Sequence, residues 1–267
     1  MVSQTVLPFK LASTDETLTA QAGLALFGEY CHALGVPAWL DAALPAPGSG
    51  AGYAASSHAL SVIFMLHGGG RSLEDLRTLR AESGLLALLK LESVPSSDAL
   101  GDWLRRMGAG AGLAGLACVQ RRLLERALTD SDCTAHTLDI DATKVVAEKA
   151  ATMAWYGQRG EASENRIKEL KIGFGQERMP CGQFAANAVF FRLGVLAYNR
   201  FKGFTQATLD GPWHRHQIQT LRWRVYQTAG KIVRHAGQQC LKVNRAAVGL
   251  FESIRYRCWA LAVSGAT

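Results

Sequence analysis

Four residues between positions 156 and 171 have the types and the spacing of a site that handles phosphate groups. They follow the pattern Tyr-x2-Arg-x4-Glu-x6-Lys and are Tyr156, Arg159, Glu164 and Lys171. The composition of residues 160–171 favours a helix, which would place positions 164, 168 and 171 on one face. One acid between bases suits phosphoryl transfer, in which the acid holds a divalent metal and the bases hold phosphate oxygens. The same run also fits a solvated helix with ordinary i,i+4 charge pairs.

A longer segment, from Tyr156 to Phe204, extends this pattern: YGQRGEASENRIKELKIGFGQERMPCGQFAANAVFFRLGVLAYNRFKGF. It resembles the C-terminal part of insertion-sequence transposases of the DDE group 1 type. These enzymes share the signature Tyr-x2-Arg-x3-Glu-x6-Lys. In this chain Glu164 comes one residue later after Arg159, and the Glu-x6-Lys step is kept.

The resemblance implies a role for each residue of the segment. Glu164 is expected to be the third metal-binding acid. Because of the one-residue offset, Glu169 is its substitute, although no lysine follows it seven residues on. The residues expected to bind phosphate or DNA are Tyr156, Arg159, Arg166, Lys168 and Lys171.

Upstream, residues 136–143 (HTLDIDAT) predict a short strand with apolar side chains on one face and acids on the other. LDIDAT resembles the first catalytic strand of the same transposases, which implies that Asp141 is the first metal-binding acid. Asp139 is its substitute. The plainer interpretation is an aspartate that ends an edge strand.

The resemblance also implies the rest of the machinery. The family fold is a ribonuclease H-like α/β domain preceded by an N-terminal helical domain. Two Mg²⁺ or Mn²⁺ ions would be held by Asp141, a second aspartate and Glu164. The implied partner is double-stranded DNA, as the terminal inverted repeats of the insertion sequence and as its target.

The interval between the two acids is too short for this machinery. Asp141 and Glu164 are 23 positions apart, and no aspartate occurs in residues 142–209. Two strands and their turns would fill most of that interval. The sequence therefore predicts an internal deletion near residues 150–155, and a transposase whose catalysis is impaired because the second acid is missing. Whether it is still an enzyme is left open.

Charge is distributed unevenly along the chain. Residues 1–143 hold 10 Lys and Arg against 15 Asp and Glu, whereas residues 144–267 hold 19 against 7. Residues 212–259 contain nine bases and one acid, interleaved with five Trp and Tyr residues. This composition indicates phosphate contact, although a basic helix that only solubilises a core fits equally. The alternative function is a non-catalytic helical DNA-binding protein, alone, as a homodimer or with an intact transposase. A third alternative is that the shortened chain folds poorly.

These patterns predict a mainly α protein with a small α/β remnant, in three parts. Residues 1–130 form an N-terminal helical region that holds DNA ends, residues 131–204 are the remnant of the ribonuclease H-like domain, and residues 205–267 form a basic C-terminal helical region. N-caps at Ser72 and at Ser96 or Ser97 begin two of the expected helices. A helix-turn-helix within 72–107 would use Arg105 and Arg106 as phosphate contacts; a bundle without ligand is the alternative.

Several classes of protein are disfavoured. The six cysteines show no Cys-x2-Cys pair, so neither a zinc site nor a disulfide framework is indicated. The first 25 residues lack the pattern of a signal peptide. The most apolar segment, residues 184–201, is interrupted by polar residues and predicts a buried helix rather than a membrane span. We therefore expect a cytoplasmic protein that joins the nucleoid when it binds DNA.

Overall fold

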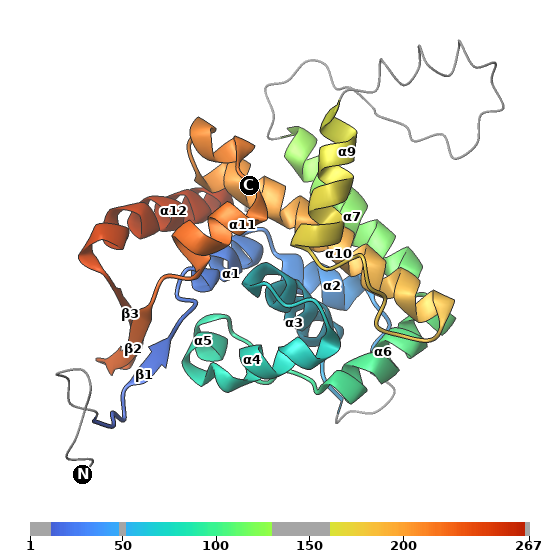
Figure 1. Ribbon diagram of the computed structural model, residues 1–267, viewed down its shortest axis with the longest axis horizontal. Helices are drawn as coiled ribbons and strands as arrows, with labels where there is room; N and C mark the ends of the chain where they lie inside the picture. Colours follow the sequence, from blue (N-terminus) through green and yellow to red (C-terminus); the bar gives the residue numbers. More distant parts are fainter. Residues whose placement is uncertain (1–11, 48–51, 130–160, 265–267) are drawn as a thin grey trace, which may run out of the picture.

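Helices dominate the computed structural model, which describes residues 12–47, 52–129 and 161–264 (Figure 1). The predicted strand at 136–143, with Asp139 and Asp141, lies outside these residues, as do Tyr156 and Arg159. The first part of the chain comprises β1 (Thr17–Thr19), α1 (Leu24–Ala33), α2 (Val36–Ala43), α3 (Ala55–Gly68), η1 (Leu73–Asp75), α4 (Leu76–Ala81), α5 (Ser83–Leu88), α6 (Ser97–Ala109) and α7 (Gly112–Thr129). The second part comprises α9 (Glu161–Lys168), η2 (Glu169–Gly173), α10 (Phe184–Thr208), η3 (Gly211–Arg215), α11 (Ile218–Leu221), η4 (Arg222–Tyr226), β2 (Gly230–His235), β3 (Gln238–Val243) and α12 (Arg245–Ser264).

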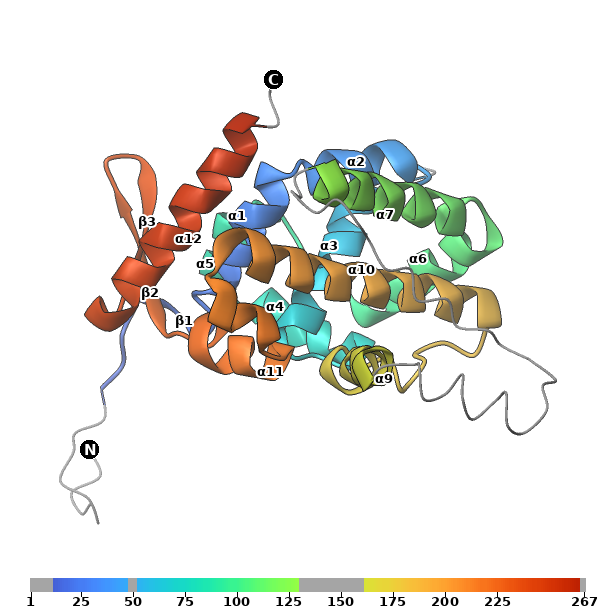
Figure 2. The ribbon, with the colours of Figure 1, turned by 90° about the horizontal axis from the view of Figure 1, so that it is seen from above.

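Two helices form the centre of the molecule. Every residue of α3 from Leu60 to His67 is buried, so this helix has no solvent face. The 25-residue α10 runs across it and also contacts α6 and α7 (Figure 2). One hydrophobic cluster extends from Leu24 in α1 to Cys258 in α12, so both halves of the sequence share a core. The buried helix predicted at 184–201 is confirmed, and it extends to Thr208.

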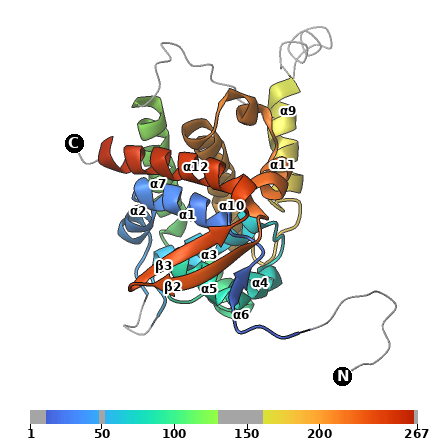
Figure 3. The same ribbon diagram turned by 90° about the vertical axis from the view of Figure 1, so that its left-hand side faces the viewer.

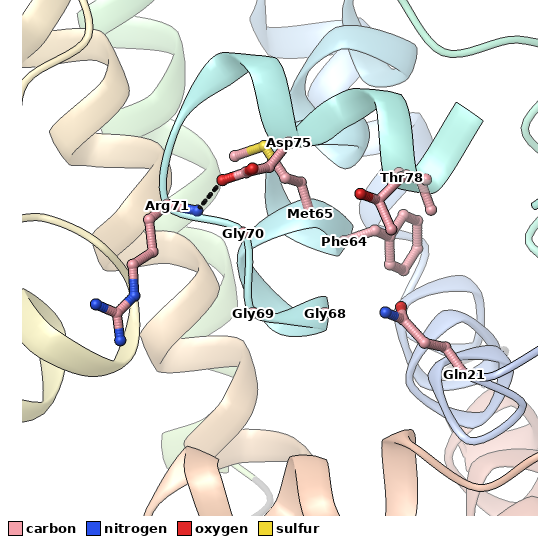
Figure 4. A pocket seen from close by; sticks show the side chains of 10 residues that line it. Gln21, Phe64, Met65, Gly68, Gly69, Gly70, Arg71, Asp75 and Thr78 are labelled. Carbon is pink, nitrogen blue, oxygen red and sulfur yellow. Dashed lines mark hydrogen bonds between the residues drawn. The ribbon is translucent and has the colours of Figure 1, made fainter. Parts of the chain in front are cut away.

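Local capping signals behave as the sequence predicts. Ser72 and Asp75 form a capping box at the start of η1: Asp75 accepts hydrogen bonds from the backbone N–H groups of Arg71 (2.8 Å) and Ser72 (3.0 Å) (Figure 4). Ser96 is the N-cap of α6, since its hydroxyl accepts from the N–H of Ala99. The capping box closes one side of a 300 Å³ pocket whose other side is the glycine turn 68–70.

The sheet is small and joins the two ends of the chain. Its order is β1-β2-β3, and both pairs are antiparallel, with Thr17 opposite Ile232 and Ile232 opposite Leu241. The sequence predicts a helical region at 205–267. The structure differs, because these residues also contain the β2–β3 hairpin. Ala236 and Gly237 form its turn with positive φ angles of 49° and 79°, which suits a two-residue hairpin loop.

The predicted fold class is confirmed in its coarse form: the protein is mainly α with a small sheet. Among the described residues, however, the strands come from 17–19 and 230–243 rather than from the expected remnant at 131–204. The described part of that remnant, residues 161–204, is helix and loop. Within the described part of the chain, no helix is both long and apolar enough to cross a membrane.

Candidate nucleic-acid interface and metal-binding helix

Helix α9 carries the predicted third acid. The backbone of Glu164 lies within α9, and its side chain lies outside the described part of the structure. The helix predicted over 160–171 is α-helical only to Lys168, because a π-helical turn, η2, follows and contains Lys171. The wider turn moves Lys171 away from the ideal i+7 position relative to Glu164. Turns of this kind inside helices are frequent at functional sites.

The π-helical turn is shaped by its tertiary contacts. Gly173 approaches Ile218 so closely that an added Cβ would lie 2.8 Å from Cγ2 of Ile218. Glu169, four residues earlier, accepts a 2.8 Å hydrogen bond from the backbone N–H of Ile218. Both contacts hold η2 against α11. At this point the chain forms a π-helical turn instead of a regular α-helix.

Three bases beside Glu164 face solvent. Arg166, Lys168 and Lys171 are exposed, and the described part of the chain supplies no ion-pair partner for them. They are therefore available to an anionic ligand, as the predicted phosphate contacts require. Figure 3 shows α9 rising above α11, away from the bundle.

The side chain of Glu169 has a structural role, because its carboxylate accepts a hydrogen bond within the fold. Burial raises the pKa of its carboxyl, while the hydrogen bond from Ile218 and the charges of Lys202 and Arg222 act in the opposite direction. One of its oxygens caps the start of α11. The carboxylate of Glu169 is thus engaged in a contact within the fold.

We expect Glu169→Gln to keep the capping contact and to change the free energy of unfolding by less than about 1 kcal/mol. Glu169→Ala leaves the Ile218 N–H without its acceptor and should cost about 1–2 kcal/mol. Urea denaturation of both variants at pH 7 measures the difference. Equal losses in the two variants would show that the hydrogen bond does not hold η2.

Arg222 fastens this region to the core. Its guanidinium is buried and donates to three backbone carbonyls: those of Leu66 (2.6 Å), His67 (2.8 Å) and Gly173 (2.6 Å). Burial lowers the pKa of Arg222 to about 10, the largest of the influences on it. In the sequence Arg222 is one of nine bases of the tail. No local signal marks it, because its partners lie 49, 155 and 156 positions away.

The remaining bases of residues 212–259 divide into two groups. Three form ion pairs with acids: Lys231 with Glu16, Arg255 with Glu29 (2.8 Å), and Arg257 with Asp210 (2.6 Å). Five others are exposed, and the structure describes no ion pair for them: Arg215, Arg224, Arg234, Lys242 and Arg245. The basic surface offered to a ligand is therefore smaller than the sequence suggests.

Aromatic side chains accompany part of this surface. The guanidinium of Arg224 lies 5.8 Å from the ring centroid of Trp223 and 5.9 Å from that of Trp213, within cation–π range. Trp223 is 71% exposed. Among the histidines of the tail, His235 is exposed, whereas His214 and His216 are half-buried, and Nε2 of His214 lies 3.0 Å from the carbonyl oxygen of Leu209.

Metal-binding side chains do not gather elsewhere. Among the residues whose side chains the structure describes, which do not include Glu164, no group of three or more His, Cys, Asp or Glu residues could hold a metal ion. The described residues thus do not form a divalent-metal site on their own. Its expected members Asp139 and Asp141 lie outside them.

A comparison with protein families bears on the resemblance found in the sequence. The model of the family described as transposase DDE domain group 1 matches residues 147–252. These residues, less than half of the chain, are similar to the transposase DDE domain. The resemblance found in the sequence is therefore confirmed. No curated protein and no solved structure matches the chain.

The matched segment contains α9 and the elements that follow it, whereas Leu66 and His67, which accept hydrogen bonds from Arg222, lie outside it. It runs from before α9 through η2, α10 and η4 to the hairpin, and ends within α12. Glu164, Arg166, Lys168, Lys171 and Arg222 all lie inside it. The helix-turn-helix expected at 72–107 lies outside it. There Arg105 forms an ion pair with Asp102, and Arg106 is exposed.

Proposed function

We propose that this protein is an insertion-sequence transposase that acts on the DNA ends of its element and whose metal-dependent phosphoryl transfer is impaired. The observation that supports it is the transposase segment at 147–252, combined with the lack of any aspartate in residues 142–209. A family site built on three acids is thereby left with two in the sequence, Asp141 and Glu164.

Each residue has a role in the proposal. Asp141 and Glu164 are the first and third acids, with Asp139 and Glu169 as their substitutes. The exposed Arg166, Lys168 and Lys171, with Tyr156 and Arg159, bind the phosphates beside the scissile bond. The capping contact of Glu169 favours Glu164 as the acid that points toward DNA.

The metal requirement explains why catalysis should be impaired. When bound, two Mg²⁺ or Mn²⁺ ions supply the nucleophile and neutralise the charge that develops on the leaving oxygen. The two ions of such a pair lie about 3.5–4 Å apart and are held by several carboxylates. The chain's own residues still bind and orient the phosphate, because Arg offers a planar fork and Lys a point charge. DNA binding should therefore survive where cleavage does not.

The test is nicking of a supercoiled plasmid that carries the terminal repeats, with Mg²⁺ or Mn²⁺, by the natural chain and by Glu164→Gln. We expect salt-sensitive binding by both proteins and cleavage by neither. Cleavage by the natural chain that disappears in Glu164→Gln would show that another acid replaces the missing aspartate, and would contradict the impairment. An absence of DNA binding would contradict the proposal as a whole.

A second candidate function is a non-catalytic DNA-binding protein that occupies the ends or pairs with an intact transposase. The five exposed bases of the tail favour it, because binding DNA through them requires neither the catalytic sheet of the family nor a metal ion. In either case we propose a cytoplasmic protein that associates with the nucleoid through DNA, alone or as a homodimer.

A further inference from the structure

The β2–β3 hairpin lies at one end of the molecule, next to α12 (Figure 2), and beyond its pairing with β1 it is a two-stranded ribbon. Its base is attached to the core, because Ile232 is buried and packs near Gly84. From Arg234 to Cys240, however, every residue is exposed, so both faces of the outer half meet solvent. A two-stranded ribbon of this kind has little to pack against and is only marginally stable in water.

The charge of the ribbon has one sign. No acid occurs between Gly230 and Phe251, whereas four bases do: Lys231, Arg234, Lys242 and Arg245. Lys231 and Lys242 are directly opposite each other in the sheet. Like charges in opposite positions destabilise a strand pair. Glu16 neutralises Lys231, but the structure describes no ion pair for Lys242. An anionic partner bound at Lys242 would neutralise its charge and remove this repulsion.

The hairpin and α9 lie toward opposite ends of the molecule (Figures 1 and 2). A phosphate backbone that reaches the ribbon is therefore a different stretch from the one beside Glu164. The hairpin nevertheless belongs to the transposase segment, which extends to residue 252. It occurs in the part of the chain whose family acts on DNA.

We propose that the β2–β3 hairpin is a second DNA-contacting arm, which binds the phosphates of duplex DNA away from α9 through Arg234 and Lys242, together with Arg245, the first residue of the adjoining α12. This inference rests on the proposed function, since it takes DNA as the ligand. A β-ribbon is narrow enough to lie along the major groove of B-DNA, which is about 12 Å wide. Bases on both faces of the ribbon would then reach the two phosphate walls.

Strand addition by a second copy of the chain is the competing use of β3, because it is an edge of the sheet. Lys242 disfavours this pairing, since a lysine on an edge strand discourages contact with another edge. We therefore favour DNA, and the oligomeric state becomes an outcome of the test.

The experiment compares two variants that each remove two positive charges. Arg234→Gln/Lys242→Gln changes the hairpin. The control, Arg77→Gln/Arg80→Gln, changes two exposed bases of α4 that lie among Glu74, Asp75 and Glu82 in the sequence. Binding to a duplex of about 30 base pairs is measured by fluorescence anisotropy at several salt concentrations, because the slope of log K against log salt counts neutralised phosphates. Sedimentation of each protein without DNA gives its oligomeric state.

The slope is negative, and we expect its magnitude to decrease by about 1.8 in the hairpin variant, which is about 0.9 for each of the two lost phosphate contacts. The control variant should leave the slope unchanged. Equal slopes in the natural chain and the hairpin variant would overturn the arm while leaving DNA binding by the rest of the protein intact. A hairpin variant that loses a dimer and keeps its slope would also overturn it. If the natural chain binds no DNA, the proposed function itself fails.

Discussion

Replacing Arg222 by methionine is expected to lower the free energy of unfolding by about 3–5 kcal/mol. The guanidinium is the donor to three buried carbonyls, two at the C-terminal end of α3 and one at Gly173 in η2. Methionine fills much of the same volume but donates no hydrogen bond. Each carbonyl left without its donor costs about 1–3 kcal/mol, and partial relaxation reduces the sum.

Arg224→Met is the matched control, two residues along the same turn. Arg224 is exposed, and within the described part of the chain its contacts are with the rings of Trp213 and Trp223, so we expect a loss of about 1 kcal/mol or less. Urea denaturation followed by circular dichroism measures both variants. Similar losses would mean that the carbonyl contacts of Arg222 contribute little.

The Arg222 contact also links stability to the candidate site. Because one carbonyl belongs to η2, the turn that follows α9, losing it should let η2 and α9 move relative to α10 and α11. Arg222→Met should therefore weaken DNA binding even under conditions in which it remains folded. Arg224→Met would lower the affinity by removing a single exposed charge.

Local signals in the sequence predicted local structure well. Ser72 with Asp75 and Ser96 mark helix starts because a side-chain oxygen meets a backbone N–H only two to three residues away, and that geometry is set by the helix itself. The long apolar run at 184–201 became α10 because the alternation of buried and exposed positions is likewise encoded within one element. The Glu-x6-Lys spacing of Glu164 and Lys171 can likewise be recognised from residues within one short segment.

Long-range contacts set what the sequence did not reveal. The π-helical turn at 169–173 depends on Ile218, 49 positions from Glu169, so a pattern within residues 160–171 predicts an unbroken α-helix. The role of Arg222 depends on carbonyls of α3 and η2, and in sequence it cannot be told apart from Arg224. The sequence does not predict the hairpin, because the composition and charge of residues 205–267 favour helices. Its turn, Ala236-Gly237, is only a weak turn signal.

The protein should lose stability as the pH falls, and His67 should be a main cause. His67 is buried, stacks on Phe27 at a centroid distance of 3.6 Å, and lies between two partners. Its Nε2 lies 3.0 Å from the carbonyl oxygen of Ala197, which can only accept, so Nε2 carries the proton. Its Nδ1 lies 3.1 Å from the Tyr226 hydroxyl and accepts from it. The neutral ring is therefore fully satisfied.

Burial is the largest influence on His67 and lowers its pKa from 6.5 to about 3; the charge of Arg222 acts in the same direction. In the unfolded chain His67 is protonated with a pKa of about 6.5, whereas in the folded protein it is protonated only near pH 3. Below pH 6.5 this difference costs about 1.4 kcal/mol per pH unit, or about 2 kcal/mol between pH 8 and pH 5. The stability that His67 contributes is fully present above pH 6.5 and declines as the pH falls toward 3.

His67→Gln should abolish that part of the pH dependence, because glutamine can still donate to the Ala197 carbonyl but does not titrate. We expect the variant to be less stable than the natural protein at pH 8, with a difference that shrinks by about 2 kcal/mol at pH 5. His235→Gln, at the exposed end of β2, is the control and should follow the natural protein at every pH. Burial also lowers the pKa of His58, so some pH dependence will remain in His67→Gln. A His67→Gln variant that loses stability between pH 8 and pH 5 as steeply as the natural protein would show that His67 is not the group responsible.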